Sequence, residues 1–178
     1  MGKLEKTILW VLRAAQEFGI NDLSKLQIHK IVYLIEIEAR KFSGESFFTE
    51  DVTFQREKMG PISVQVYNAL NNINKYVDVI ISDGQNYTAP RHGYRLKKSV
   101  KIDQFKLPDG DMLFLGSVIQ DYIDLNQGQL KKIAYNTEPM EEIINQEKKE
   151  KSACKAGVQL NMSLVTVDEE LVRAIADG

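Results

Sequence analysis

The sequence contains very few of the residues that build disulfides or metal sites. Among 178 residues there is one cysteine, Cys154, and there are two histidines, His29 and His92. A single cysteine excludes an internal disulfide and suits a reducing compartment, so we expect a cytoplasmic protein. Two histidines far apart in the sequence make a poor metal site with one cysteine, so we expect no bound metal. His29 on its own is interpreted as a residue at the polar edge of a helix.

Long apolar stretches, an excess of one charge and the common catalytic motifs are also missing. No apolar run approaches the ~20 residues that span a bilayer, and 23 basic residues nearly balance 25 acidic ones. This balance gives no bulk attraction to nucleic acid or to a membrane. A Gly-rich phosphate loop, a Gly-x-Ser-x-Gly turn and a His-Glu-x-x-His pair do not occur. We therefore expect no catalytic residues, no cofactor, no membrane partner and no enzymatic activity.

The strongest positive signal is a helix that begins after Ser24. Ser24 and Gln27 have the spacing of a capping box, and Leu23 and Ile28 have the spacing of a hydrophobic staple. Apolar residues then recur three and four positions apart as far as Phe42, and further apolar residues widen this face. A helix that is apolar over so much of its surface is expected at the centre of a domain.

A glycine-proline pair, Gly60-Pro61, follows a short extended segment at residues 52–54. The glycine can adopt backbone angles that are closed to other residues, and the proline presets φ for a first helical turn. A second amphipathic helix is therefore predicted to start at this pair. Its apolar positions run from Ile62 to Val77, and Tyr67 lies beside that face.

The remaining patterns predict a mainly α, α+β fold, a compact helical domain around the central buried helix. The predicted elements are a first helix over 4–18, a β-hairpin that pairs 79–81 with 86–88 around Asp83-Gly84, a strand at 94–96 that extends this sheet, and helices near 112–122, 129–135 and 139–144. We assign residues 1–150 to this domain.

Residues 151–178 are predicted to form an extension that follows a charged stretch. Positions 158–164 alternate between apolar and polar like a half-buried strand, and Thr166 and Glu169 have the spacing of a capping box for a short helix. A lone strand and helix are not stable by themselves, so they must pack on the body or on a second protomer. Pairing of this strand across a two-fold axis would give a homodimer.

Three segments together resemble the Panacea domain, which is also called the SocA-like antitoxin domain. They are KLQIHKIVYL at residues 25–34, FQREKMGPISVQVYNAL at 54–70 and AYNTEPM at 134–140. The family pattern has a KLQKLLYL-type helix, then an aromatic residue, a Gly-Pro pair and a tyrosine, and a late segment like TH-x-E-x-P-W. Asn136 and Met140 depart from that late segment.

The resemblance covers roughly residues 4 to 145. It implies a small cytosolic bacterial or phage antitoxin that neutralises a cognate, neighbour-encoded toxin by direct protein contact. It also implies a domain without catalytic activity, with a protease as a further partner in some members.

The contact surface is expected at the corner between the extended segment and the Gly-Pro helix. A tight turn displays rigid backbone and cationic side chains at low entropic cost. The residues assigned to this surface are Lys25, His29, Lys30, Arg56, Lys58, Gly60, Pro61 and Tyr67. The alternative is that Gly60 and Pro61 only shape a helix start and that Tyr67 belongs to the core.

A winged-helix-like DNA-binding regulator is the alternative function, because a helix, a link, a second helix and a hairpin follow one another in the order of that module. The polar residues on the outer face of the Gly-Pro helix are Gln65, Asn68, Asn72 and Lys75, and the cations after the hairpin are Arg91, Arg95, Lys97 and Lys98. Asn and Gln pair with adenine edges, and cations contact phosphates. The opposing interpretation is a solvated polar face, since a reader helix with a single lysine makes few phosphate contacts.

Overall fold

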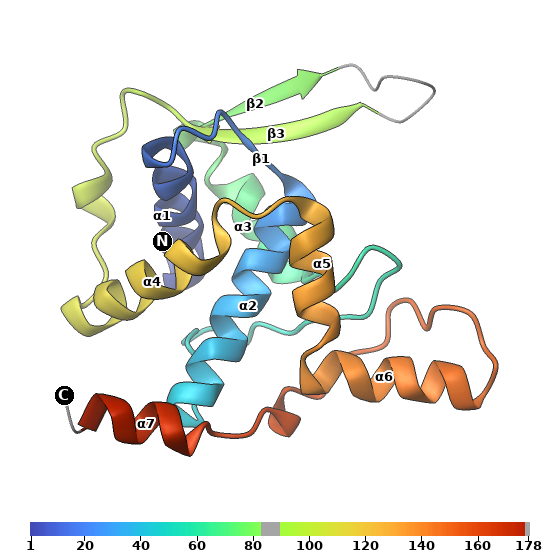
Figure 1. Ribbon diagram of the computed structural model, residues 1–178. Coiled ribbons are helices and arrows are strands. Elements are labelled where there is room, and N and C mark those ends of the chain that lie inside the picture. Colours follow the sequence, from blue (N-terminus) through green and yellow to red (C-terminus); the bar gives the residue numbers. More distant parts are fainter. Residues whose placement is uncertain (83–89, 177–178) are drawn as a thin grey trace.

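The computed structural model describes residues 1–82 and 90–176, which form helices around a small sheet (Figure 1). The helices are α1 (Lys3–Glu17), α2 (Lys25–Ser43), α3 (Val64–Asn72), α4 (Asp109–Tyr122), α5 (Gln127–Tyr135), α6 (Glu138–Lys149) and α7 (Glu169–Ala176). The strands are β1 (Leu23–Ser24), β2 (Val77–Ser82) and β3 (Arg91–Leu96), and short 3₁₀ turns occur at η1 (Asn74–Tyr76), η2 (Ile102–Phe105) and η3 (Met162–Leu164). The predicted mainly α, α+β fold is confirmed.

Helix α2 runs through the middle of the molecule, with α1, α4 and α5 packed against it (Figure 1). The predicted capping box closes its start: Gln27 N–H donates to Ser24 Oγ over 3.2 Å, and Ser24 N–H donates to Gln27 Oε1 over 3.0 Å. Gly44 ends the helix with a φ of 75°. Residues 28–37 are all buried, including a histidine, a lysine and a glutamate. The prediction of a central buried helix is confirmed.

Helix α1 ends in the way that its glycine indicates. Gly19 has a φ of 74°, its N–H donates to the Gln16 carbonyl over 3.0 Å, and the Ile20 N–H donates to the Ala15 carbonyl over 2.8 Å. These two bonds form a Schellman motif.

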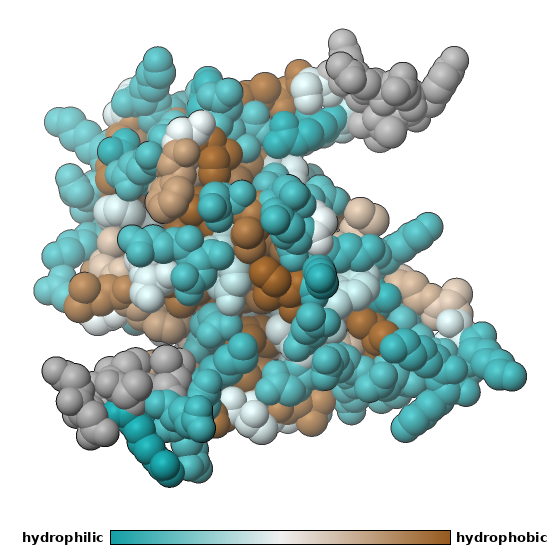
Figure 2. Space-filling model, viewed as in Figure 1, coloured by the Kyte–Doolittle hydropathy of each residue, from teal (hydrophilic) through white to brown (hydrophobic). Residues whose placement is uncertain are grey.

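Polar side chains cover most of the face in Figure 2, with apolar side chains visible near its middle. None of the described helices combines the length and the apolarity needed to cross a membrane.

The three antiparallel strands lie in the order β1-β3-β2 at one end of the helices (Figure 1). Val77 of β2 is opposite Leu96 of β3, and Leu23 of β1 is opposite Tyr94 on the other side of β3. The side chains of Leu96, Tyr94 and Val77 are buried, so the sheet covers the helical core with one face. Strand β1 precedes α2 directly and was not predicted.

The predicted hairpin contains the right first strand and the wrong partner. Residues 79–81 pair with 92–94 of β3, so they do not pair with 86–88. The predicted partner and the Asp83-Gly84 turn lie outside the described residues. Burial of apolar side chains fixes which segment pairs with β2 and in which register. Strand β3 provides Tyr94 and Leu96 for the core.

The helix after the Gly-Pro pair begins at Val64, later than predicted. Ile62 and Gln55 exchange two backbone hydrogen bonds of 2.8 and 3.0 Å, which keep the chain extended beyond the proline. Ser63 then becomes the N-cap, and its Oγ accepts from the Val66 N–H over 3.4 Å. The proline therefore shapes the entry to α3 and does not occupy its first turn.

The predicted strand at 158–164 is wrong. Only Gln159 forms a single β-bridge, and residues 162–164 form the turn η3. The backbone N–H groups of Gly157 and Leu160 donate to the carbonyls of Arg56 and Phe54, each over 2.8 Å, so this segment lies along the 54–56 segment of its own chain. The sequence argument for a homodimer through the extension depended on a strand that does not form. The division of the chain at residue 150 stays a prediction.

The short C-terminal helix forms, with a different cap from the predicted one. Helix α7 starts at Glu169, and the Glu170 N–H donates to Asp168 Oδ1 over 3.1 Å. Thr166, the predicted cap, instead donates from its hydroxyl to a carboxylate oxygen of Glu138 over 3.2 Å. The cap therefore lies closer to the helix, and Thr166 connects the extension to α6.

Candidate functional site

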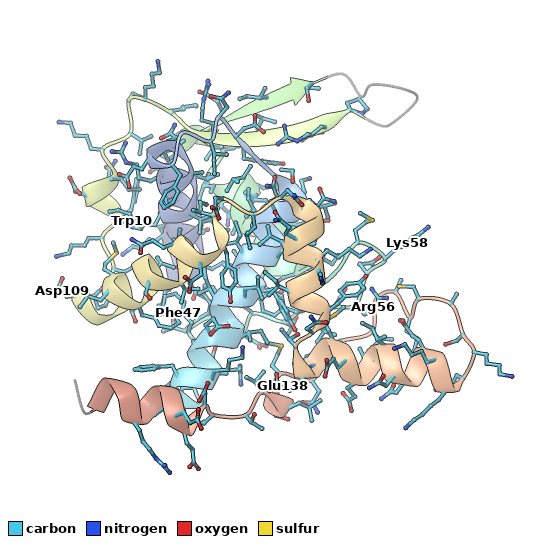
Figure 3. The ribbon with its side chains drawn as sticks, viewed as in Figure 1. Trp10, Phe47, Arg56, Lys58, Asp109 and Glu138 are labelled. Atoms are coloured by element: carbon cyan, nitrogen blue, oxygen red, sulfur yellow. The ribbon has the colours of Figure 1, made fainter. Side chains whose placement is uncertain are left out.

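The predicted contact surface is centred on a loop that is closed by its own backbone. The two hydrogen bonds between Gln55 and Ile62 make residues 56–61 a closed turn, which we call the corner loop. Gly60 lies in this loop with a φ of 110°, a conformation that residues with a side chain rarely adopt. Figure 3 shows Arg56 and Lys58 on the side of the molecule where α5 and α6 meet.

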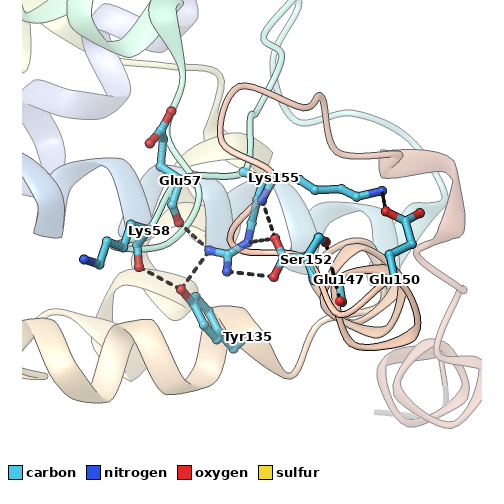
Figure 4. Close-up of polar contacts among 8 residues, drawn as sticks. Glu57, Lys58, Tyr135, Glu147, Glu150, Ser152 and Lys155 are labelled. Carbon is cyan, nitrogen blue, oxygen red and sulfur yellow. Dashed lines mark hydrogen bonds and ion pairs between the residues drawn. The ribbon is translucent and has the colours of Figure 1, made fainter.

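Arg56 is buried and bonds to three other segments, and Figure 4 shows two of its partners, Tyr135 and Glu147. Its Nε and Nη2 donate to the two carboxylate oxygens of Glu147 on α6 over 3.1 and 3.2 Å. Its Nη1 donates to the Tyr135 hydroxyl on α5 over 2.8 Å and to the Glu57 carbonyl. Its backbone N–H donates to the Val158 carbonyl over 2.8 Å. One side chain thus connects the corner loop with α5 and α6, and its backbone connects the loop with the extension.

This ion pair is buried and stays charged. Arg56 is 6% exposed and Glu147 is 9% exposed. Burial opposes the charge of Arg56, but the hydrogen bonds with Glu147 and Tyr135 outweigh it and raise the Arg56 pKa. Burial also opposes the charge of Glu147, but bonds from Arg56 and the Lys155 backbone N–H outweigh it and lower the Glu147 pKa. Arg56 therefore supports the corner loop from inside, while its assignment to the contact surface stays a prediction.

Lys30 lies beneath the corner loop, and no described carboxylate pairs with it. Its side chain is fully buried, and Nζ donates only to the Leu26 carbonyl, over 3.3 Å, in the described part of the chain. A Cβ on Gly60 would lie 3.0 Å from the Lys30 Cε. Burial, and then the charge of Lys131, lower the pKa of Lys30 to about 8, so it remains mostly protonated at pH 7. A buried positive charge is thus covered by a residue that has no side chain.

His29 is buried beside Lys30 and is neutral. The Ser63 N–H donates to His29 Nδ1 over 3.1 Å, and Nε2 has no hydrogen-bond partner among the described residues. The imidazole packs on the Tyr67 ring with centroids 4.3 Å apart, and Lys25 Nζ lies 5.1 Å from that ring's centroid. Burial, and then the charges of Lys30 and Lys25, lower the pKa of His29 to about 3. His29 and Lys30 therefore lie under the surface on which they were expected.

A groove of about 820 Å³, which we call the corner groove, opens beside the corner loop. It is lined by Ser24, Lys25, Leu26, Met59, Pro90, Arg91, His92 and Gln127. The starts of α2 and α5 both contribute to it, and the positive ends of two helix dipoles favour an anion there. No carboxylate is among these lining residues. Met59, 42% exposed, adds an apolar surface, and Lys58 next to it is exposed.

Several residues of this region were not predicted from the sequence. Tyr135 lies in the AYNTEPM segment, whose pattern was noted without a role. Glu147 lies in the charged stretch before residue 151 and was given no role, because its partner Arg56 is 91 positions away. Gln127 joins the groove through the packing of α5 against α2, and Met59 joins it from the corner loop. Within the described ranges, no group of three or more His, Cys, Asp or Glu side chains is placed to hold a metal ion.

Many residues of the alternative nucleic-acid surface are engaged within the chain. On the helix face, Asn72 donates to Glu5 over 2.8 Å, and Gln65 bonds to Ser63 and Thr53. Among the cations, Arg91 pairs with Asp22 at 2.7 Å and Arg95 pairs with Asp78 at 3.4 Å. The Lys97 side chain donates to the Lys75 carbonyl over 2.9 Å. Asn68, Lys75 and Lys98 are exposed. Paired cations have less charge to offer to phosphates. DNA binding therefore stays a prediction with little support from these contacts.

The fold and the corner groove define a helical domain with a groove that is lined by Lys25 and by the starts of two helices. Residues 28–140 match the family described as Antitoxin SocA-like, Panacea domain. The match covers more than half of the chain, so the chain belongs to this family. It runs from α2 into α6 and includes the corner loop, and it is shorter than the range of 4–145 expected from the motifs. No curated protein matches the chain.

Proposed function

We propose that this protein is a cytoplasmic antitoxin that neutralises a protein toxin by direct contact through the corner groove. Membership of an antitoxin family supports the activity. The observation that carries the choice of surface is a groove lined by Lys25 and by two helix starts, with no carboxylate among the described residues that line it. Such a protein acts by covering the toxin, so it needs a rigid surface and no reactive group.

The chemistry of the groove favours an acidic partner segment. Lys25 lies in the groove lining and Lys58 is exposed next to it, while the Lys30 charge below has no counter-ion among the described residues. Complementary charge speeds association and fixes orientation. A carboxylate of the toxin above Gly60 would reduce the cost of the buried Lys30 charge, and an apolar neighbour would pack on Met59.

The rigidity of the corner loop supports the same proposal. Arg56 bonds the loop to α5 and α6, and His29 accepts the Ser63 N–H that follows the loop. A surface that is already ordered loses little conformational entropy on binding. His29, Lys30 and Arg56 would therefore contribute to affinity by holding the groove in shape and by their charge, without direct contact.

Co-expression with the product of the adjacent gene tests both the activity and the surface. That product should stop growth when it is expressed alone, and the wild-type protein should restore growth. Reversing the charge of half-buried Lys25 and exposed Lys58 with Lys25→Glu and Lys58→Glu should reduce the restoration at least ~10-fold, because electrostatic complementarity is inverted. The matched control is Lys98→Glu with Lys101→Glu, the same charge change at exposed lysines after β3.

The outcomes separate the activity from the surface. If the neighbouring product is toxic and the wild-type protein does not restore growth, the proposed function is wrong. If the groove variant, shown to be folded by circular dichroism, protects as well as the control variant, the function stands and the corner groove is not the contact surface.

A further inference from the structure

Strand β2 forms an open edge of the sheet. In the order β1-β3-β2, β3 is its one neighbouring strand among the described residues, and Figure 1 shows β2 on the side of the sheet away from β1. The opposite side of the sheet is covered, because β1 pairs there and the Gln16 side chain donates to the Leu96 carbonyl over 2.7 Å. The edge of the sheet on the β1 side is therefore covered, and the edge formed by β2 is open.

The register shows which backbone groups face outward from β2. The Lys97 N–H donates to the Tyr76 carbonyl over 2.9 Å, so these residues form a hydrogen-bonded pair just beyond the ladder. Hydrogen-bonded and non-hydrogen-bonded pairs alternate along an antiparallel ladder. The even-numbered residues of β2 therefore bond to β3, while the N–H and C=O groups of Val77, Val79 and Ile81 face away from it. The Val77 N–H already donates to the Asn74 carbonyl at the end of η1, while the described residues supply no partner for the outward groups of Val79 and Ile81.

The same edge carries exposed apolar side chains. Val79 is 49% exposed and Ile81 is 63% exposed, and both lie on the same face of the strand. Edge strands are usually protected by charges, and the one charge here, Asp78, is paired with Arg95 at 3.4 Å. An apolar edge with free backbone donors and acceptors is a template for another strand.

We infer that β2 pairs antiparallel with β2 of a second copy of this chain, across a two-fold axis at Ile80, so that the sheet continues through both copies. In this register Val79 of each copy is opposite Ile81 of the other, and Asp78 is opposite Ser82, so no like charges meet. An axis at Val79 would place Ile81 opposite Val77, whose side chain is already buried at 4% exposure. The register at Ile80 is the one that pairs both exposed apolar residues.

The contact is self-complementary but small. A stable interface buries ~1,600 Å² in total, and one six-residue strand edge covers less than this. The dimer should therefore be reversible, with a molar mass that rises from 20.3 kDa toward twice that value as the concentration is raised.

Sedimentation equilibrium of the full chain tests the dimer. The wild-type protein should show the concentration-dependent rise in mass, and Ile81→Lys should remain at the monomer mass, because a charge then faces the partner strand. Leu113→Lys on α4 is the matched control, since Leu113 is 78% exposed and lies outside the sheet, and it should associate like the wild type. A monomeric wild type, or equal association of the wild type and Ile81→Lys, overturns the inference.

Cross-linking tests the register in a Cys154→Ser background, which removes the single natural thiol. At the axis, Ile80 forms a non-hydrogen-bonded pair with its own copy, with Cα atoms ~4.5 Å apart, within the range of a disulfide. Ile80→Cys should therefore give a covalent dimer on mild oxidation. Ser82→Cys, opposite Asp78 and far from its own copy, should give at most one tenth of that yield. Equal yields at the two positions overturn the register.

Discussion

Arg56 and Glu147, 91 positions apart in the sequence, meet in a bidentate ion pair that is almost fully buried. The pair joins the loop before α3 to the last turns of α6. Because Tyr135 and the backbone of residues 157–158 bond to the same arginine, the surface that faces the proposed toxin is held from three sides.

Replacing Arg56 alone should destabilise the protein strongly. Arg56→Met leaves the Glu147 carboxylate buried without its partner, a change that costs roughly 3–5 kcal/mol of unfolding free energy. Urea unfolding at pH 7, followed by circular dichroism, measures this. Arg13→Met, which breaks an exposed pair with Glu17, should cost less than ~1 kcal/mol. Adding Glu147→Leu to Arg56→Met should restore part of the loss, and a cost no larger than that of the control would contradict the structural role of Arg56.

The burial of His29 should make the protein less stable as the pH falls below 6.5. The pKa of His29 is lowered to about 3 in the folded protein, while the unfolded chain binds a proton near the ordinary value of 6.5. Between these values the unfolded state holds more protons, so the free energy of unfolding falls with pH by roughly 1 kcal/mol per unit.

Urea midpoints at pH 7.5, 6.5 and 5.5 check this dependence. His29→Asn should lose most of the slope, because its amide oxygen can accept the Ser63 N–H but does not titrate. His92→Asn, at an exposed position, should keep the slope of the wild type. Identical slopes for the two variants would show that His29 is not its source.

Lys30 should reduce stability while it supports binding. Lys30→Met removes a buried charge that has no counter-ion in the described residues, so we expect the unfolding free energy at pH 7 to rise by roughly 1 kcal/mol. The pKa of Lys30 is about 8 in the folded protein and 10.5 in the unfolded chain, so above pH 8 the unfolded state holds more protons. The unfolding free energy of the wild type should therefore rise relative to that of the variant as the pH rises through 8. The variant should also protect less well from the toxin. A variant that is less stable than the wild type at pH 7 would contradict this account.

Gly60 should tolerate no side chain. Gly60→Ala combines a strained φ of 110° with a Cβ that would lie 3.0 Å from the Lys30 Cε, so we expect a loss of roughly 2 kcal/mol or more. Gly157→Ala, with a φ of 80° and no atom within 4 Å of its Cβ, isolates the backbone contribution and should cost about 1 kcal/mol. Thermal unfolding of both variants measures the difference, and equal losses would mean that contact with Lys30 does not matter.

Local signals predicted the central helix well, and non-local contacts explain the errors. The capping box at Ser24 and the start of α2 need only neighbouring residues, so they could be read from the sequence. The partner of residues 79–81 was missed because β3 gains its place from burying Tyr94 and from pairing with β1, which comes from a distant segment. Leu160, an apolar position of the alternation at 158–164, is buried as a strand would require. The segment nevertheless forms a single β-bridge, at Gln159, and no strand.

The contact surface expected at the corner loop stays a prediction, and the structure places its residues at different depths. Lys25 and Lys58 lie at the surface, but Lys30 and Arg56 lie beneath it. Cationic residues are usually exposed. The burial of a cationic residue can be predicted only when the residue that covers it, or its counter-ion, is known. For Arg56 the counter-ion is far along the chain, and for Lys30 the cover is a glycine in a loop whose closure the sequence does not show.

The bonds of Arg56 have a practical consequence for fragments of this chain. The family match ends at residue 140, while Glu147 and Val158, which both bond to Arg56, come after it. A protein trimmed to the matched boundaries would keep every residue of the corner loop and lose two of its anchors. The trimmed protein would also lack Ser24, Lys25 and Leu26 of the corner groove. Experiments on toxin recognition should therefore use the whole polypeptide.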